Sequence, residues 1–403
     1  MELSPIVSET FRGGCSFETS RTGTPAHWRY NDPPMRLLLA ASALICALAP
    51  CLAAGPSPDE LDRMIGQMIM VGFRGVSPDP KNPIVSDIAE GRVGGVVLFD
   101  IDGPGGGGER NVRSPKQLRR LTAWLERQAT TIPLLVAIDL EGGKVNRLKA
   151  KYGFSSVASA RELGEKDAEA WTTEVAGAVA KTLSSEGINL NFAPVVDLNS
   201  NPDNPVIGSK DRSFSADPEV VIRHARAWIS AHRQAGVLST LKHFPGHGSS
   251  RADSHLGFVD VTHTWSEDEL TPYARLISEG TVDAVMTAHI FNARLDPKYP
   301  ATLARGIITG ILRNQLGFQG VVISDDFQMK AISEHYGLKE SIRLGLDAGL
   351  DILLFANNSA WDPGIAQKAV GIIRRLVDDG QISRGRIEES YRRIRGFKEK
   401  LRR

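Results

Sequence analysis

From residue 55 onward, short apolar runs alternate with longer stretches in which apolar positions recur at helical spacing. The apolar runs are rich in Val, Ile and Leu and show no alternation of polar and apolar positions, which is typical of parallel strands covered on both faces. The pattern predicts eight strands: Met68–Phe73, Val93–Phe99, Leu134–Asp139, Ile188–Pro194, Val237–His243, Ala284–His289, Val321–Asp325 and Asp351–Phe355.

The stretches between and after these runs predict amphipathic helices. They are Pro115–Gln128, Asp167–Glu186, Pro218–Gln234, Ser266–Glu279, Leu303–Leu316, Lys339–Ala348, Trp361–Asp379 and Ser383–Lys400. Strands separated by helices predict an α/β fold, and the absence of a linker favours one closed (β/α)8 TIM barrel as a single catalytic domain. A doubly wound open sheet is the alternative. The glycine-rich stretch Gly103–Gly108 is expected to be a flexible loop, because no Gly-Lys-Ser/Thr follows it to complete a phosphate loop.

The N-terminal region has the pattern of a targeting segment. Met35-Arg36 precedes the apolar run Leu37–Leu48, and the small residues Ala53-Ala54-Gly55 follow. This order is typical of a secretory signal peptide, and the run is shorter than the roughly 20 residues of a transmembrane helix. We therefore expect residues 35–54 to be a signal peptide and residues 55–403 to be the catalytic domain. Residues 1–34 are then a non-native upstream extension that results from a misplaced start codon.

A signal peptide implies export, and we expect the protein in the periplasm. If the apolar run is instead a buried helix, a cytoplasmic location is expected. The three cysteines, Cys15, Cys46 and Cys51, all precede residue 55, so the expected catalytic domain has no disulfide framework.

The charge balance gives no reason to expect nucleic acid as a partner. The chain has 48 Lys and Arg against 47 Asp and Glu, a formal net charge of +1. A neutral or mildly charged small substrate is the simplest partner for such a chain. We expect a monomer without stable membrane insertion.

Polar residues gather where the predicted strands end, which is where barrel enzymes carry their chemistry. Asp139, Lys242-His243, His289 and Ser324-Asp325-Asp326 stand at such ends, and Asp197 follows another. Ionisable groups at the end of a buried strand are costly unless they are paired or used. Two carboxylates with a Lys-His pair between them make a pocket suited to sugar hydroxyls, and cutting a glycosidic bond requires a nucleophile or base and a proton donor.

Several motifs in order resemble the β-N-acetylglucosaminidase branch of family 3 glycoside hydrolases. The most specific is Lys242-His243-Phe244-Pro245-Gly246-His247-Gly248 followed by Asp253-Ser254-His255. The others are Asp139–Gly143, Gly187–Pro194, Arg212-Ser213-Phe214, Met286–His289 and Ile323–Asp326, so the resemblance covers roughly residues 60 to 360. It implies a (β/α)8 barrel, no metal, no cofactor and β-linked N-acetylglucosamine as the recognised sugar.

The resemblance also implies roles for individual residues. Asp325 matches the nucleophile of the family, and His255 and Asp253 match its acid/base pair, in which His255 exchanges the proton and Asp253 orients the ring. The matches to sugar-binding residues are Asp139, Arg212, Lys242 and His243, and Asp197 and His289 are expected to support them. The implied activity is a retaining exo-β-N-acetylglucosaminidase that acts on peptidoglycan fragments or chitooligosaccharides through a covalent glycosyl-Asp intermediate.

Other functions stay open at this stage. The same fold could act as a β-glucosidase, as an N-acetylglucosaminide phosphorylase, or as a sugar-binding module without activity. The histidines His243, His247, His255 and His289 could instead belong to a metal-dependent barrel hydrolase, although Lys242 would place a cation beside the metal. Asp325 and Asp326 could also assist attack by the acetamido oxygen of the substrate.

Overall fold

The computed structural model of the protein describes residues 58–103, 106–129 and 132–402. The expected upstream extension and signal peptide lie outside the described residues. The described residues form one compact unit. In the part that the structure describes, no helix combines the length and the apolar character that crossing a membrane requires.

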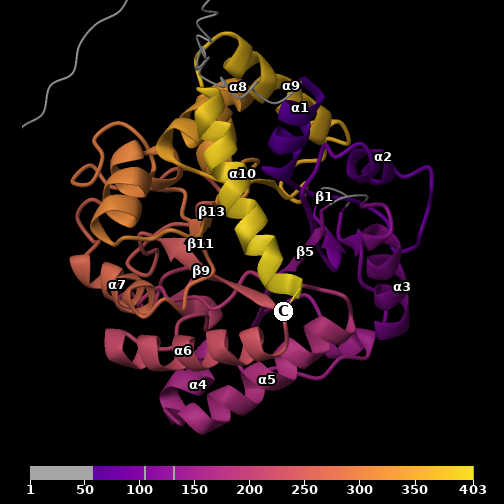
Figure 1. The fold of residues 1–403 in the computed structure, drawn as a ribbon. Helices are drawn as coiled ribbons and strands as arrows, with labels where there is room; N and C mark the ends of the chain where they lie inside the picture. Colours follow the sequence, from indigo (N-terminus) through magenta and orange to yellow (C-terminus); the bar gives the residue numbers. More distant parts are fainter. Residues whose placement is uncertain (1–57, 104–105, 130–131, 403) are drawn as a thin grey trace, which may run out of the picture. The chain divides into compact units, whose positions relative to one another are not determined.

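Eight parallel strands form the centre of this unit (Figure 1). Their order in the sheet is β13-β11-β9-β8-β5-β2-β1-β14, and a parallel bridge from Ile323 to Ile352 joins the first strand to the last. The closed sheet is a (β/α)8 barrel, as expected. The strands are β1 (Ile69–Gly72), β2 (Gly95–Leu98), β5 (Leu135–Ile138), β8 (Leu190–Asn191), β9 (Leu238–Phe244), β11 (Ala284–Thr287), β13 (Val321–Ile323) and β14 (Leu353–Phe355).

Each expected strand segment contains one barrel strand, with β9 running one residue further than predicted. Every residue of these strands is buried, which is why most of their positions are apolar rather than alternating. The polar exceptions include Asn191 in β8 and Lys242 in β9, which lie near the carboxyl ends of their strands. Strand pairing is in register along β2 and β5, where Val96 faces Val136 and Leu98 faces Ile138.

Helices surround the barrel (Figure 1). They are α1 (Pro58–Gln67), α2 (Pro83–Ala89), α3 (Pro115–Glu126), α4 (Ala160–Lys166), α5 (Glu169–Ser185), α6 (Pro218–Gln234), α7 (Thr271–Ser278), α8 (Lys330–Ala348), α9 (Ile365–Asp378) and α10 (Arg384–Glu399). Capping residues determine where several of these helices begin. Ser114 forms a capping box with Gln117 at the start of α3, and Asp217 caps the start of α6 ahead of Pro218. The sequence predictions located most of these helices but missed α1, α2 and α4.

Two predicted helices differ in detail from the observed ones. The segment expected as Leu303–Leu316 is a π-helix, η5 (Gly306–Gln315), after a short 3₁₀ turn, η4 (Ala301–Leu303). The helix expected from Lys339 begins at Lys330 instead, and Gly337 interrupts it with φ 60° and ψ 157°. The predicted start therefore marks the second part of a helix that is broken at this glycine.

The glycine-rich stretch lies beside a small antiparallel pair, β3 (Ile101–Asp102) and β4 (Gly108–Glu109). A second antiparallel pair, β6 (Leu140–Gly142) with β7 (Val145–Asn146), follows β5, and β10 (Val259–Asp260) pairs in parallel with β12 (Ile290–Phe291). These short strands lie in the loops that follow β2, β5, β9 and β11. All four loops leave the barrel at its carboxyl end.

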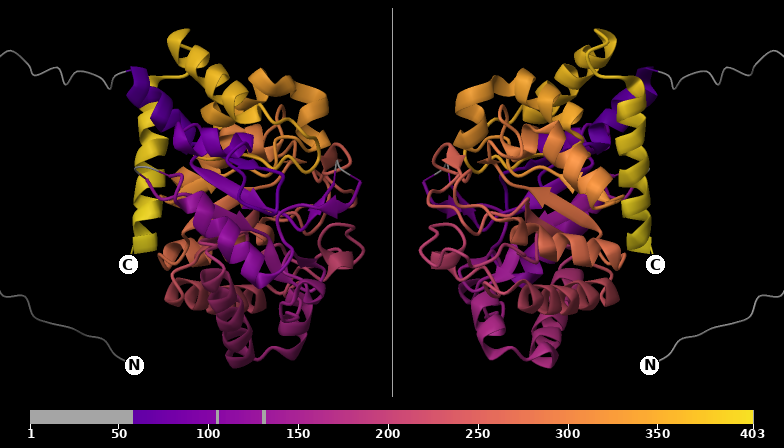
Figure 2. Two further views of the ribbon diagram at one scale, coloured as in Figure 1. Left: turned by 90° about the vertical axis from the view of Figure 1, so that its right-hand side faces the viewer. Right: turned by 90° about the vertical axis from the view of Figure 1, so that its left-hand side faces the viewer.

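Helix α10 covers the opposite, amino-terminal end of the barrel, and it stands along one side of the unit in both views of Figure 2. Buried Lys398 donates to the Gln67 side chain (2.7 Å) and to the Gly94 carbonyl (2.6 Å), just before β1 and β2. Lys400 pairs with Asp283, just before β11, at 2.8 Å. Lys398 in α10 and Lys400 just after it thus bond to residues at the starts of β1, β2 and β11.

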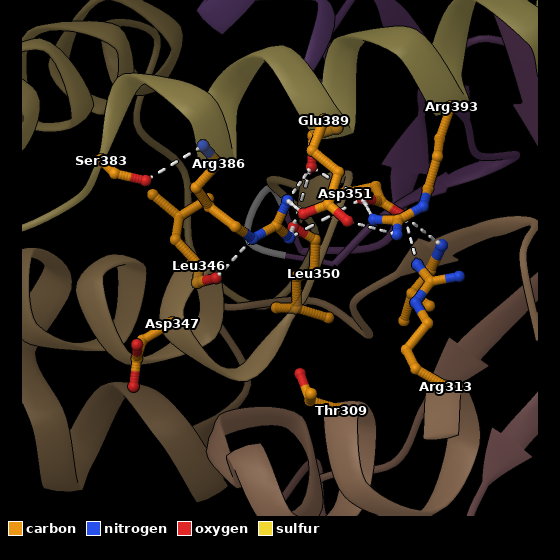
Figure 3. Close-up of polar contacts among 12 residues, drawn as sticks. Thr309, Arg313, Leu346, Asp347, Leu350, Asp351, Ser383, Arg386, Glu389 and Arg393 are labelled. Carbon is orange, nitrogen blue, oxygen red and sulfur yellow. Dashed lines mark hydrogen bonds and ion pairs between the residues drawn. The ribbon is translucent and has the colours of Figure 1, made fainter. Parts of the chain in front are cut away.

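At the other end of α10, the fully buried Asp351 joins the helix to the start of β14 (Figure 3). One carboxylate oxygen accepts from Arg313 at 2.6 Å, and the other accepts from Ser390 at 2.7 Å and lies 3.3 Å from Arg393. Arg386 lies 3.7 Å away and also donates to the carbonyls of Leu346 and Leu350. Glu389 also pairs with Arg393 at 2.6 Å and lies 3.7 Å from Arg386, so Asp351 and Glu389 together compensate for the three guanidinium groups.

Candidate active site

A pocket of about 400 Å³ opens at the carboxyl end of the barrel. Its lining includes residues that directly follow different strands, such as Asp139 after β5 and Asp325 after β13. Six of the residues that match catalytic or sugar-binding positions of the family line it, namely Asp139, Arg212, Lys242, His243, His255 and Asp325, and so do His247 and Asp326. The barrel therefore brings together side chains that lie as much as 186 positions apart, from 139 to 325 in the chain.

One wall is a network of alternating charges. Lys242 lies 2.8 Å from Asp139 and 2.6 Å from Glu141, and Arg212 forms two parallel 2.7 Å bonds with Glu141. Burial alone would raise the pKa of Glu141, but the charges of Arg212 and Lys242 outweigh it and lower the pKa to about 2. Glu141 is thus ionised and holds both cations in place.

Glu141 was not singled out in the sequence, although a signal for it was present. It lies two positions beyond Asp139, the last residue of the expected strand, and residues two apart in an extended chain point to the same side. Arg212 Nη2 also lies 3.2 Å from His243 Nε2, so the network continues to the imidazole.

The ring of His243 is oriented from behind by Asp197. This fully buried carboxylate lies 2.7 Å from His243 Nδ1 and accepts the backbone N–H groups of His243 (3.0 Å) and His247 (2.8 Å). Burial opposes ionisation, but His243 and these hydrogen bonds lower the pKa of Asp197. A carboxylate on Nδ1 favours the tautomer that leaves Nε2 facing the pocket.

Glycines in the motif after β9 allow the chain to lie against a buried carboxyl group. A Cβ at Gly246, where φ is +116°, would come within 2.4 Å of the Glu269 side chain, and one at Gly248 would meet the Leu198 carbonyl at 1.7 Å. Glu269 accepts from the Leu198 backbone N–H at 3.1 Å. Burial and the charge of Asp197 raise the pKa of Glu269 to about 8, so this carboxyl group is protonated at neutral pH.

Asp325 stands at the end of β13 and is partly exposed to the pocket. One of its oxygens accepts the backbone N–H of Asp326 at 2.8 Å. Burial would raise its pKa, but the nearby His289, His243 and His255 lower it overall. An ionised carboxylate facing a pocket is the form that a nucleophile requires.

His289 and Asp326 lie beside Asp325 and support the surrounding loops, and Asp326 also lines the pocket. His289 is buried and bonds to Thr302 Oγ1 (2.7 Å) and to the Asp326 carbonyl (2.9 Å). Asp326 accepts the backbone N–H groups of Gln328 and Ala356, each at 3.0 Å, and burial raises its pKa to about 6. Both residues thus connect the end of β13 to neighbouring elements.

Asp253 and His255 form a close pair on the segment between β9 and β10. His255 Nδ1 lies 2.7 Å from Asp253 Oδ1, which also accepts the His255 backbone N–H at 2.9 Å. The hydrogen bond from His255 lowers the pKa of Asp253 to about 2. The surrounding protein disfavours the charged ring, but the bond to Asp253 and the charge of Asp325 raise the pKa of His255 overall. The pair can hold and release a proton beside the pocket.

No group of three or more His, Cys, Asp or Glu side chains is placed to hold a metal ion within the described ranges. The four histidines considered from the sequence have other partners: His243 faces Asp197, His255 faces Asp253, His289 bonds to Thr302, and His247 bonds to serines. Lys242 adds a buried cation to the same pocket. This donor set suits the hydroxyl groups of a sugar better than a divalent cation.

Residues 60–396 match the family described as "Glycosyl hydrolase family 3 N terminal domain". The chain belongs to this family. Among curated relatives, it is 34% identical over 384 residues to Beta-hexosaminidase A of Pseudoalteromonas piscicida, covering 86% of this chain and 62% of that protein. It is 41% identical over 273 residues to the Beta-hexosaminidase of Tolumonas auensis, covering 66% of this chain and 77% of that protein.

Solved structures of family 3 proteins have the same fold. A β-N-acetylglucosaminidase from Paenibacillus sp. str. FPU-7 superposes with a TM-score of 0.77 at 36% identity, over 85% of this chain and 62% of that one. A β-N-acetylhexosaminidase from Beutenbergia cavernae superposes with a TM-score of 0.74 at 30% identity, over 84% of this chain and 98% of that one. The chain thus spans 62% of some family 3 relatives and nearly the full length of others.

Proposed function

We propose that this family 3 chain is a retaining exo-β-N-acetylglucosaminidase that removes the terminal non-reducing sugar from peptidoglycan fragments or chitooligosaccharides. The observation that carries the proposal is the ionised Asp325 in a pocket that also holds a carboxylate-paired imidazole, His255. These are the nucleophile and proton donor that glycoside cleavage requires. The names of the relatives, Beta-hexosaminidase and β-N-acetylglucosaminidase, support the choice of sugar.

In the proposed first step, an Asp325 carboxylate oxygen attacks C1 of the sugar. The bond from C1 to the leaving oxygen breaks, and the imidazolium of His255 gives its proton to that oxygen. In the second step, water loses a proton to the neutral His255 ring and attacks C1, which releases Asp325 as a carboxylate. Asp139, Arg212, Lys242 and His243 hold the hydroxyl groups of the sugar throughout, and Asp197 keeps the ring of His243 in place.

The first test uses 4-nitrophenyl N-acetyl-β-glucosaminide beside the corresponding β-glucoside, with purified residues 55–403. We expect turnover of the N-acetyl substrate alone, at a rate that EDTA leaves unchanged. Turnover of the glucoside alone would instead indicate a β-glucosidase, and loss of activity in EDTA would indicate a metal-dependent hydrolase. If a folded preparation cleaves neither substrate, the proposal is wrong and a sugar-binding module becomes the better hypothesis.

The acceptor of the second step can be identified from the product. Water gives free N-acetylglucosamine, whereas inorganic phosphate would give the sugar 1-phosphate of an N-acetylglucosaminide phosphorylase. We propose water, and adding phosphate to the assay should leave the product unchanged.

The pH profile should depend on the Asp253–His255 pair. Cleavage requires the protonated ring, so the raised pKa of His255 keeps the enzyme active to higher pH. Asp253→Asn removes a charge that favours the imidazolium, and we expect the alkaline limb of kcat/KM to move to lower pH. The matched control is Asp260→Asn, because Asp260 is exposed and bonds to the Thr262 backbone N–H rather than to His255. An unmoved limb in Asp253→Asn would argue against His255 as the proton donor.

We also propose that the protein is exported to the periplasm and acts as a monomer on a small carbohydrate, without nucleic acid. Export is supported by the apolar run Leu37–Leu48 and the small residues after it. N-terminal sequencing of the protein recovered from a periplasmic fraction should give a start near residue 55, and sedimentation should give the mass of one chain. An uncleaved protein in the cytoplasmic fraction would contradict export.

A further inference from the structure

The segment Arg251–Gly257 carries the Asp253–His255 pair, and much of it is exposed. The His255 side chain is 52% exposed, and Leu256 beside it is 75% exposed. A segment with so little buried surface needs specific contacts if it is to present an imidazole at a fixed position.

One polar contact meets this need. Ser254, which stands between Asp253 and His255, is buried, and its Oγ lies 3.3 Å from Nε2 of His247. Within the described parts of the chain, no other hydrogen bond joins Arg251–Gly257 to a different segment. The attachment of the proposed acid/base pair therefore depends on the His247 side chain.

His247 is itself firmly held. Its backbone N–H donates to Asp197 at 2.8 Å, and its carbonyl accepts from Asn204 at 2.8 Å. Its ring packs edge-on against His243, with 6.0 Å between ring centroids. Because Asp197 also orients His243, the same carboxylate anchors a sugar-binding residue and the contact that supports the acid/base segment.

The other ring nitrogen of His247 extends the connection. Nδ1 lies 2.8 Å from Ser250 Oγ, so one imidazole bridges the hydroxyl groups of Ser250 and Ser254. Burial and the nearby charge of His243 lower the pKa of His247 to about 4, which keeps the ring neutral. A neutral ring has one donor and one acceptor, and a serine hydroxyl group can satisfy either.

We propose that His247 is a positioning residue that, through Ser254, holds the Asp253–His255 pair against the pocket. The inference rests on the proposed glycosidase function and adds to it a residue that acts through Ser254 rather than on the reacting atoms. If His247 acts in this way, breaking its bond to Ser254 should impair proton transfer to the leaving group and leave attack by Asp325 intact.

Ser254→Ala tests this with two substrates that differ only in the leaving group. Phenyl N-acetyl-β-glucosaminide needs a proton from the enzyme, whereas the 2,4-dinitrophenyl analogue departs without one. Because a displacement of about 1 Å can cost roughly 100-fold in rate, kcat/KM for the phenyl substrate should fall by about 10- to 100-fold. For the dinitrophenyl substrate it should fall by less than about threefold, since acid catalysis contributes little there. Azide should raise kcat of the variant on the dinitrophenyl substrate, because azide attacks the glycosyl-enzyme without a base.

Ser250→Ala is the matched control. It removes the other hydroxyl group bonded to His247, but the Ser250 carbonyl stays attached to Asn201 at 2.7 Å, so both substrates should keep nearly full activity. His247→Ala should reproduce the pattern of Ser254→Ala, and unfolding midpoints establish that each variant is folded. Equal losses on both substrates in Ser254→Ala, or no loss, would overturn the role of His247. A wild-type protein that cleaves neither substrate would overturn the proposed function itself.

Discussion

Asp325→Ala is expected to lower kcat/KM on the N-acetylglucosaminide by about 10³-fold or more, because removing a nucleophile eliminates the covalent route. Among the described residues, the adjacent carboxylate of Asp326 is not free to replace it. Asp326 has its carboxylate engaged by the backbone N–H groups of Gln328 and Ala356, and its pKa is raised to about 6 by burial. The methyl group of alanine is also smaller than the side chain of Asp325, so it leaves a space beside the face of the sugar that Asp325 would attack.

Two measurements identify the cause of this loss. Azide added to Asp325→Ala should restore turnover of a substrate with a good leaving group and give the glycosyl azide of inverted configuration. In the wild-type protein, a 2-fluoro sugar should label the peptide that contains Asp325. Retention of more than about a tenth of the activity in the variant would contradict its role as nucleophile, and an unlabelled wild-type protein would favour assistance by the acetamido oxygen of the substrate.

Asp351→Ala is expected to cost about 3–5 kcal/mol of unfolding free energy, the usual range for removing one partner of a buried ion pair. The substitution leaves Arg313, Arg386 and Arg393 close together without their shared carboxylate (Figure 3). It also leaves the Ser390 hydroxyl group and the Val322 backbone N–H without the oxygens that accept them.

Urea unfolding followed by circular dichroism measures this effect. The matched control is Asp347→Ala, because Asp347 is 49% exposed and pairs with Arg305 at the surface. An exposed pair of this kind contributes at most about 1 kcal/mol. Similar unfolding free energies for the two variants would show that the Asp351 cluster contributes no more than a surface pair.

The sequence was sufficient for the barrel because the physical demand on its strands is simple. A strand covered on both faces is apolar at most positions, and this leaves a run without charged residues such as Val93–Phe99. Helical periodicity was a weaker guide. It does not separate an α-helix from the π-helix at Gly306–Gln315, and it overlooked α4, although Ser159 and Glu162 form a capping box at its start.

For the candidate site, the sequence located groups at strand ends, but not the contacts between them. Lys242 and Asp139 were both singled out, whereas their 2.8 Å separation depends on the closure of the barrel. Glu141 was not singled out, and His247 was considered only within the loop motif and as a metal ligand, because the contacts through which they act are not visible in the sequence. Glu141 could have been found from its spacing to Asp139, but the bridge from His247 to Ser254 depends on the folded path of the loop.

Helix α10 has a consequence for the synthesis of the protein. Proteins fold from the N-terminus as the chain emerges from the ribosome, yet Lys398 supplies contacts to residues 67 and 94, which are made more than 300 positions earlier. Until α10 has emerged, the starts of β1 and β2 lack the lysine that bonds to them. An interrupted chain would therefore present an uncovered barrel floor, the kind of exposed apolar surface that chaperones and proteases recognise. The contacts at the starts of β1 and β2 are therefore complete only once α10 has been made.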